Sequence, residues 1–220
     1  DDLPTASEVV DALLAADLDG ADAAYERMAT RLAPPDLVAR LIEPGLVETG
    51  ERWFRGECTI GQEHCATGFF RRRLGLLIDA ARRENPRPRH SALVGTVQGD
   101  RHEGGVLIVA LLLELAGWRA LPVGVDLPIR EYQKAIARWR PEALALSFVL
   151  SRSINKRFQE LALIRDVPVF VGGRSILNYQ GLARRHGLIP LVGPAPQSIR
   201  TLTVEFARRG RGQPPEPGPD

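Results

Sequence analysis

The sequence predicts an α/β protein in which a four-helix bundle precedes a domain of alternating strands and helices. Apolar residues recur at helical spacing over the first 84 residues, and beyond them short apolar runs alternate with helical segments. The chain has 220 residues, of which 44% are hydrophobic and 25% charged. This is the composition of a globular chain with enough apolar material to form a core.

Four helices with short connections are predicted in the first part of the chain, at residues 7–16, 21–32, 34–54 and 60–83. The third opens at Pro34-Pro35, because proline is favoured in the first turn of a helix. Gly56 is expected to cap its end. Residues Thr59 to Gln62 have the pattern of a capping box that opens the fourth helix. Helices arranged in this way are typical of a four-helix bundle.

Residues 85–90 are predicted to be a linker, because their sequence is rich in proline. Beyond them, strands are predicted at residues 92–97, 120–123, 143–149, 167–171 and 188–191, each followed by a helix. Five such units predict a five-stranded parallel sheet of the Rossmann or flavodoxin type. The predicted domains are a bundle at 1–84, an α/β domain at 91–209 and a disordered tail at 210–220.

Composition and charge argue against several classes of function. The chain has no run of about 18 uncharged apolar residues, which excludes a membrane-spanning helix, and its start lacks the pattern of a signal peptide. A net charge of +2 is too small to indicate nucleic-acid binding. Cys58 and Cys65 lack the spacing of a disulfide framework or a zinc site. We therefore expect a cytoplasmic protein with reduced thiols that binds neither membrane nor DNA.

Chemistry in the second domain is predicted at the carboxyl ends of the strands, where open parallel sheets bind their ligands. The first strand is followed by the loop Gly99 to Gly105, which lacks the glycine and lysine pattern of a P-loop or a dinucleotide fingerprint. Asp100 precedes His102 by two residues, so its carboxylate can orient the imidazole as a metal ligand. Taken alone, a histidine in such a loop is more often an ordinary surface residue than a metal ligand.

Together with two later strand ends, this loop resembles the cobalamin-binding domain of methionine synthase, the carbon-skeleton mutases and their relatives. The matching residues are Asp100, His102, Gly105, Ser147, Val149, Gly172 and Gly173. The resemblance implies that His102 is the lower ligand of cobalt and that Asp100 orients it. It also implies that the nucleotide tail of the cofactor lies near Ser147 and the two glycines. Val149 stands where the family often has leucine, and the glycines are alternatively plain turn residues.

A second group of residues lies at the junction between the third and fourth predicted helices. Trp53 ends one helix, and Glu63 and His64 begin the next, so their side chains are expected to converge at one end of the bundle. Glu63 also extends an apolar stripe along the fourth helix, formed by Thr67, Phe70, Leu74, Leu77 and Ala81. A carboxylate there either meets a polar partner or ends the stripe in solvent. A tryptophan such as Trp53, taken by itself, is more often a core residue than part of a lid over a cofactor.

The spacing of Trp53, nine residues and Glu63-His64 resembles the signature of adenosylcobalamin photoreceptors of the CarH type. That resemblance covers residues from about 5 to 205 and implies that these three side chains surround the 5′-deoxyadenosyl group. In the CarH type a histidine follows the tryptophan, whereas this chain has Phe54. The MerR-like DNA-binding domain of that type has no counterpart here. The related photocobilins add a bilin, so a bilin such as biliverdin is a second candidate cofactor.

These resemblances predict a light sensor and not an enzyme. Photolysis of the cobalt–carbon bond is expected to release the adenosyl group and to change both domain packing and oligomeric state. The expected partners are further copies of the chain, joined through the bundle, and a regulatory protein. Two alternatives are a corrinoid protein that carries methyl groups between methyltransferases and a cobalamin-binding antirepressor. A methyl carrier must expose the upper face of its cofactor, whereas a lid of tryptophan, glutamate and histidine closes it.

Overall fold

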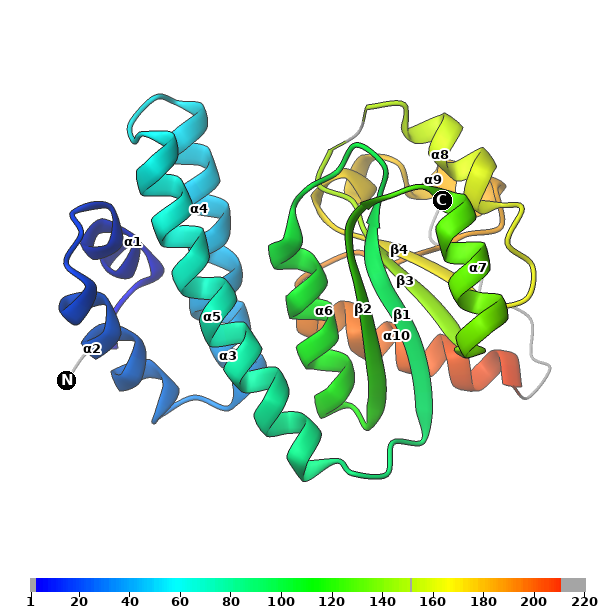
Figure 1. Ribbon diagram of the computed structural model, residues 1–220, viewed down its shortest axis with the longest axis horizontal. Helices are drawn as coiled ribbons and strands as arrows, with labels where there is room; N and C mark the ends of the chain where they lie inside the picture. Colours follow the sequence, from blue (N-terminus) through cyan, green and yellow to red (C-terminus); the bar gives the residue numbers. More distant parts are fainter. Residues whose placement is uncertain (1–2, 151, 211–220) are drawn as a thin grey trace. The chain divides into compact units, whose positions relative to one another are not determined.

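The computed structural model describes residues 3–150 and 152–210, and the chain divides into two units, Asp1–Glu84 and Asn85–Asp220 (Figure 1). The first unit consists of helices, and the second contains a sheet with helices on both faces. The tail predicted to be disordered lies outside the described residues except for Gly210, which ends the last helix. Among the described residues, no helix is long and apolar enough to cross a bilayer.

The helical unit, as far as the structure describes it, is built from helical elements joined by short connections. Its elements are α1 (Ala6–Leu14), α2 (Leu18–Ala29), α3 (Pro34–Leu37), the π-helical turn η1 (Val38–Ile42), α4 (Glu43–Phe54) and α5 (Ile60–Glu84). The predicted third helix is therefore a run of three consecutive elements, α3, η1 and α4. The widened turn ends two residues before Pro44, whose ring would clash with the carbonyl four residues earlier in a regular helix.

Both predicted caps at the α4–α5 junction are confirmed. Gly56 has a φ of +74°, and its N–H donates to the carbonyl of Trp53 at 3.0 Å. The N–H of Gln62 donates to Oγ1 of Thr59 at 3.2 Å, and the N–H of Thr59 donates to Oε1 of Gln62 at 2.9 Å. These local interactions fix where α4 stops and α5 starts.

The buried face of α5 differs in part from the predicted stripe. Its buried residues are Ala66, Phe69, Phe70, Leu74, Ile78 and Ala81, whereas Thr67 and Leu77 are only partly buried. The face is broader than one stripe because α5 packs against both α1 and α4. The two helices approach closely at Gly45 of α4, where a Cβ atom would lie 2.5 Å from the Phe70 ring.

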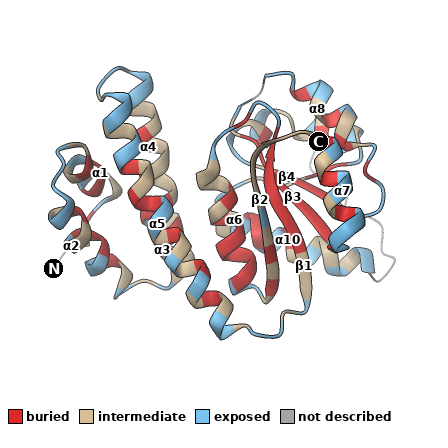
Figure 2. Ribbon diagram, viewed as in Figure 1, coloured by how far each residue is buried: buried red, intermediate tan, exposed pale blue. Residues whose placement is uncertain are grey.

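Five parallel strands form one sheet in the second unit, which confirms the predicted fold class. The strands are β1 (His90–Val97), β2 (Trp118–Leu127), β3 (Ala143–Ser147), β4 (Val169–Gly172) and β5 (Ile189–Pro190), in the spatial order β2-β1-β3-β4-β5. The inner strands are buried on both sides (Figure 2), which explains why they appear in the sequence as continuous apolar runs.

Helices cover both faces of the sheet. They are α6 (Glu103–Leu115), α7 (Ile129–Trp139), α8 (Ile154–Leu161), the 3₁₀ helix η2 (Arg174–Asn178), α9 (Gln180–Arg185) and α10 (Ala195–Gly210). Helices α6 and α10 pack together, and α7, α8 and α9 contribute to one apolar core cluster with the sheet. The single helix predicted between the fourth and fifth strands is thus two short ones, η2 and α9.

Candidate functional site

Asp100 connects the ends of two adjacent strands through its carboxylate. It follows β1 and is only 2% exposed. Its Oδ2 atom accepts hydrogen bonds from the N–H groups of Val149 at 2.7 Å and Leu150 at 3.1 Å, just beyond β3. Its Oδ1 atom accepts the N–H of His102 at 3.2 Å and lies 2.7 Å from Nδ1 of the same residue. The buried carboxylate therefore has partners on both oxygens and fixes the loop that carries His102.

The charge on Asp100 determines which nitrogen of His102 is available to a ligand. Burial raises the pKa of the Asp100 carboxyl, but the hydrogen bonds from His102, Val149 and Leu150 outweigh burial and lower it below its ordinary value. An ionised carboxylate can only accept hydrogen bonds, so Nδ1 of His102 carries the proton. The lone pair is then on Nε2, and the half-exposed ring can offer this atom to a metal.

Ser147 and Gly105 lie against each other beside this loop. Ser147 ends β3 and Gly105 lies in the first turn of α6. A Cβ atom on Gly105 would lie 2.4 Å from the Ser147 hydroxyl oxygen, so only glycine fits without rearrangement. Within the part of the chain that the structure describes, this hydroxyl makes no hydrogen bond. Such a group can bind a polar part of a ligand.

The two glycines after β4 differ in what the structure requires of them. Gly173 has a φ of +99°, and a Cβ atom there would lie 2.5 Å from the carbonyl oxygen of Phe148. The close approach is therefore to the protein's own backbone. A Cβ atom on Gly172 would make an ordinary contact at 3.5 Å with Leu191. Val149 lies in the loop beyond β3, and it joins the site through its backbone N–H.

Asp126 and Thr96 also belong to this loop network, and sequence analysis missed both. Asp126, near the end of β2, binds the N–H of Gly99 and the side chain of Arg101 through its carboxylate. Thr96 is fully buried in β1, and its hydroxyl donates to the carbonyl of Asp100. A polar residue inside an otherwise apolar strand was the signal that could have identified them.

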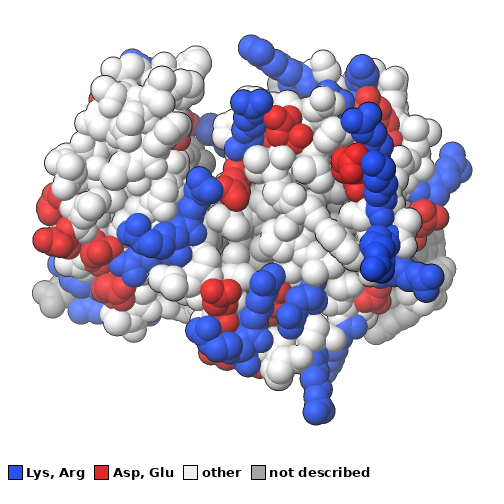
Figure 3. Space-filling model, viewed as in Figure 1, with Lys and Arg blue, Asp and Glu red and all other residues white. Residues whose placement is uncertain are grey.

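Trp53, Glu63 and His64 lie at one end of the α4–α5 hairpin in the helical unit (Figure 1). Glu63 is partly buried, and one of its oxygens lies 2.5 Å from Nδ1 of the largely exposed His64 ring. Trp53 is 48% exposed and the adjacent Phe54 is 86% exposed, so neither is a core residue. The same hairpin also carries an exposed ion pair, in which Nε of Arg55 lies 2.6 Å from Oε1 of Glu57, and the face seen in Figure 3 is otherwise mostly uncharged there. The hairpin end thus combines exposed aromatic rings with one carboxylate–imidazole pair.

These features fit a corrinoid cofactor in three respects. A buried anion holds a histidine in the tautomer that ligates through Nε2, as the lower ligand of cobalt must. The hydroxyl of Ser147 lies next to a glycine that leaves no side chain over it. The exposed rings of Trp53 and Phe54 offer apolar surface to a second ligand group.

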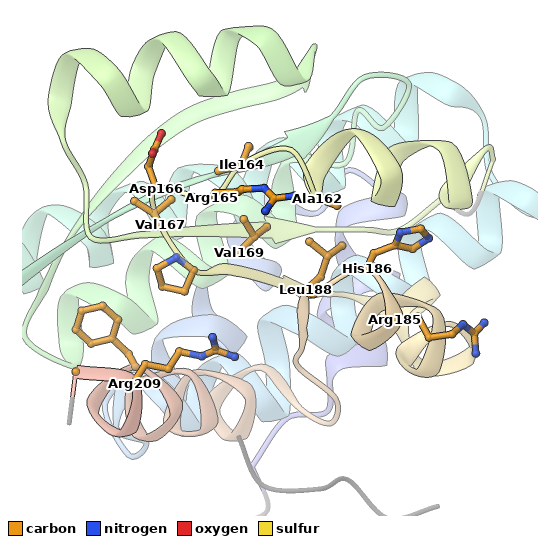
Figure 4. Close-up of a pocket in the computed structure, with 14 residues that line it drawn as sticks. Ala162, Ile164, Arg165, Asp166, Val167, Val169, Arg185, His186, Leu188 and Arg209 are labelled. Carbon is orange, nitrogen blue, oxygen red and sulfur yellow. The ribbon is translucent and has the colours of Figure 1, made fainter. Parts of the chain in front are cut away.

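A separate cavity of about 850 Å³ lies at the opposite, amino-terminal edge of the sheet. Val167 to Val169 line it before and at the start of β4, and Leu188 lines it before β5. Figure 4 shows Arg165 and Arg209 on either side of its apolar floor, with Asp166 directed away. The cavity shares no lining residue with the predicted site.

Comparison with known proteins relates the chain to cobalamin proteins. Residues 5–78 match the family described as B12 binding domain. The chain is 32% identical over 190 residues to the HTH-type transcriptional repressor CarH of Myxococcus xanthus, which covers 84% of this chain and 57% of CarH. It is 24% identical over 165 residues to the trimethylamine corrinoid protein of Methanosarcina barkeri, covering 70% of this chain and 75% of that protein.

Among solved structures, the chain resembles the monomethylamine corrinoid protein of Methanosarcina barkeri. The TM-score is 0.68 at 16% identity, over 90% of this chain and 96% of the other. This likeness concerns the fold. The chain spans 57% of the length of CarH, so the match with CarH covers only part of that protein.

Proposed function

We propose that the protein is a light sensor whose chromophore is adenosylcobalamin. The match of residues 5–78 to the family described as B12 binding domain supports the choice of cofactor. Cobalamin, a cobalt compound, is the cofactor that this family indicates. The light-sensing part of the proposal rests on the group Trp53, Glu63 and His64. These residues lie at a hairpin end, with Trp53 and His64 exposed and Glu63 partly buried, and they have the spacing of the CarH-type signature.

His102 is the proposed lower ligand of cobalt, and Asp100 orients it. Because Asp100 accepts four hydrogen bonds, including two from the backbone beyond β3, the imidazole cannot turn without breaking a bond to a buried anion. The ring is thereby held with Nε2 outward before any cofactor arrives. In the proposal, Ser147 and the glycines Gly105, Gly172 and Gly173 accommodate the nucleotide tail, and Val149 contributes its backbone.

Trp53, Glu63 and His64 are proposed to enclose the adenosyl group. A half-exposed indole offers an apolar face on which a flat base can stack, and Glu63 offers a carboxylate that accepts hydrogen bonds from a sugar hydroxyl. When bound, adenosylcobalamin supplies a cobalt–carbon bond that light can cleave. Loss of the adenosyl group would leave these side chains without their contacts, which favours another arrangement of the protein.

The proposed output is a change in self-association and in binding to a regulatory partner, without catalysis. The rival function is a methyl carrier, since the trimethylamine corrinoid protein is also a relative. A methyl carrier would bind methylcobalamin at least as well as adenosylcobalamin. A sensor with an adenosyl lid would favour adenosylcobalamin, and that preference would depend on Trp53.

The test measures both the affinity for different cobalamins and the response of the loaded protein to light. Protein loaded with adenosylcobalamin is kept dark or exposed to green light, and absorption and molar mass in solution are measured. Because free adenosylcobalamin is also cleaved by light, the decisive result is a light-dependent change in molar mass. An unchanged mass, together with equal affinity for methylcobalamin, would favour the methyl carrier. Repeating the spectra after adding biliverdin tests for a second chromophore.

The role of His102 as the lower ligand of cobalt is tested separately with the variant His102→Ala. We expect this variant to lose the absorption signature of histidine ligation and to bind cobalamin more weakly, because removing the imidazole takes away the only protein atom proposed to contact cobalt. An unchanged spectrum would show that another residue is the lower ligand.

A further inference from the structure

The edge strand β2 has an irregular register that places Asp126 beside the loop after β1. Gly95 pairs with Gly124, whereas Val97 pairs with Leu127, so β2 contains one more residue than β1 between these pairs. Such a bulge redirects side chains along a strand. Here the irregular segment includes Asp126, which adopts a φ of +59°.

The carboxylate of Asp126 binds the loop on both sides of Asp100. Its Oδ1 atom accepts the N–H of Gly99 at 2.8 Å, and its Oδ2 atom accepts a hydrogen bond from Nε of Arg101 at 2.9 Å. Gly99 itself has a φ of +94°, which glycine adopts without strain, and the N–H group of this turn is bound from outside the loop by Asp126.

The backbone N–H of Asp126 contacts Asp100, the residue between Gly99 and Arg101. This N–H lies 3.0 Å from the carbonyl oxygen of Asp100 and 2.9 Å from the Thr96 hydroxyl. The Thr96 hydroxyl in turn donates to the same carbonyl of Asp100, and the hydroxyl of Tyr132 donates to the carbonyl of Thr96 at 2.7 Å. Gly99, Asp100 and Arg101 are therefore each held by one residue of β2.

We propose that Asp126 is a positioning residue for His102. It does not contact His102, but it fixes the loop that presents Asp100, and Asp100 holds the imidazole. A loop held from both β2 and β3 keeps Nε2 at one place, so cobalt can bind without first ordering the loop. This inference rests on the proposed role of His102.

Three variants separate the contributions of the carboxylate. Asp126→Gly removes the carboxylate but tolerates the left-handed φ and retains the N–H. Asp126→Asn keeps an acceptor for Gly99 and also tolerates this φ. Arg101→Ala is the matched control, because its side chain is 82% exposed and exposed ion pairs contribute little.

The first measurement is hydrogen exchange of residues 97–103 in the cobalamin-free protein, and the second is the affinity and axial-ligand spectrum with hydroxocobalamin. We expect Asp126→Gly to speed exchange of the Gly99 N–H and to weaken binding by about tenfold, the low end for residues that support a metal ligand. The spectrum should show a larger fraction without histidine ligation. Asp126→Asn should restore most of the affinity, and Arg101→Ala should resemble the wild type.

Each outcome supports or contradicts the inference. Wild-type affinity and spectrum in Asp126→Gly would overturn it, and so would Asp126→Asn binding as weakly as Asp126→Gly. The proposed function fails by a different result, an unchanged spectrum in His102→Ala. The exchange measurement requires no cofactor, so it reports on loop support even in that case.

Discussion

Gly105 and Ser147 face each other where helix α6 begins and strand β3 ends, and a Cβ atom on Gly105 would lie 2.4 Å from the Ser147 hydroxyl oxygen. Gly105 has an ordinary helical φ, so its identity is required by this neighbour and not by backbone conformation. The glycine of the sequence motif is therefore explained by packing across the sheet end.

The first prediction is that Gly105→Ala destabilises the protein. Overpacking of this kind typically costs about 1–3 kcal/mol, because α6 or Ser147 must move. Ser147→Ala in the same chain should recover part of the loss by removing the hydroxyl. Urea unfolding measures both, with Gly181→Ala as the control, because the nearest atom to a Cβ there is 4.0 Å away. If the changes in unfolding free energy caused by Gly105→Ala and Ser147→Ala simply add in the double variant, the proposed clash between the two residues is contradicted.

A second prediction concerns pH and Asp100. Because its folded pKa lies below the ordinary value of 3.8, folding favours the ionised form. The resulting stability is present above the ordinary pKa and is lost as the pH falls through the folded value. Asp100→Asn lacks this charge, so the wild type should exceed the variant in unfolding free energy near pH 6, and the gap should narrow below pH 4. Denaturant unfolding across this pH range measures the difference in unfolding free energy between the wild type and the variant. A difference that does not change with pH would contradict the prediction.

Trp53→Ala is predicted to alter ligand selectivity without much loss of stability. With 48% of the side chain exposed, its removal should change the unfolding free energy by roughly 0.5 kcal/mol or less. Phe70→Ala, in the buried face of α5, should cost about 3–5 kcal/mol and serves as the contrast. Affinity for hydroxocobalamin should persist, whereas the preference for adenosylcobalamin should fall. Equal loss of both affinities would make Trp53 a structural residue.

The fourth prediction concerns Phe54, which stands where the CarH type has a histidine. A phenyl ring has no lone pair, and His64 is paired with Glu63, so we expect no histidine to ligate the upper face after illumination. The illuminated spectra of the wild type and His64→Ala should therefore agree. Phe54→His should produce a different spectrum, because an imidazole at this exposed position is free to ligate cobalt. A spectrum of two imidazole ligands in the wild type that disappears in His64→Ala would contradict this.

The sequence by itself determined the features that depend on neighbouring residues. The capping box at Thr59, the end of α4 at Gly56 and the five strands all follow from local patterns, because hydrogen bonds within a few residues and apolar periodicity specify them. The pairing of Asp100 with His102 is local in the same sense, since only Arg101 lies between them in the sequence.

Only the tertiary structure decided the contacts between segments distant in the sequence. Asp126 reaches Gly99 because β2 carries an irregular register against β1, and this register depends on how the two strands pair. Gly173 is held against Phe148 and Gly105 against Ser147 by the alignment of neighbouring strand ends. The physical reason is that strand pairing fixes which residues become neighbours, and that pairing depends on the whole sheet.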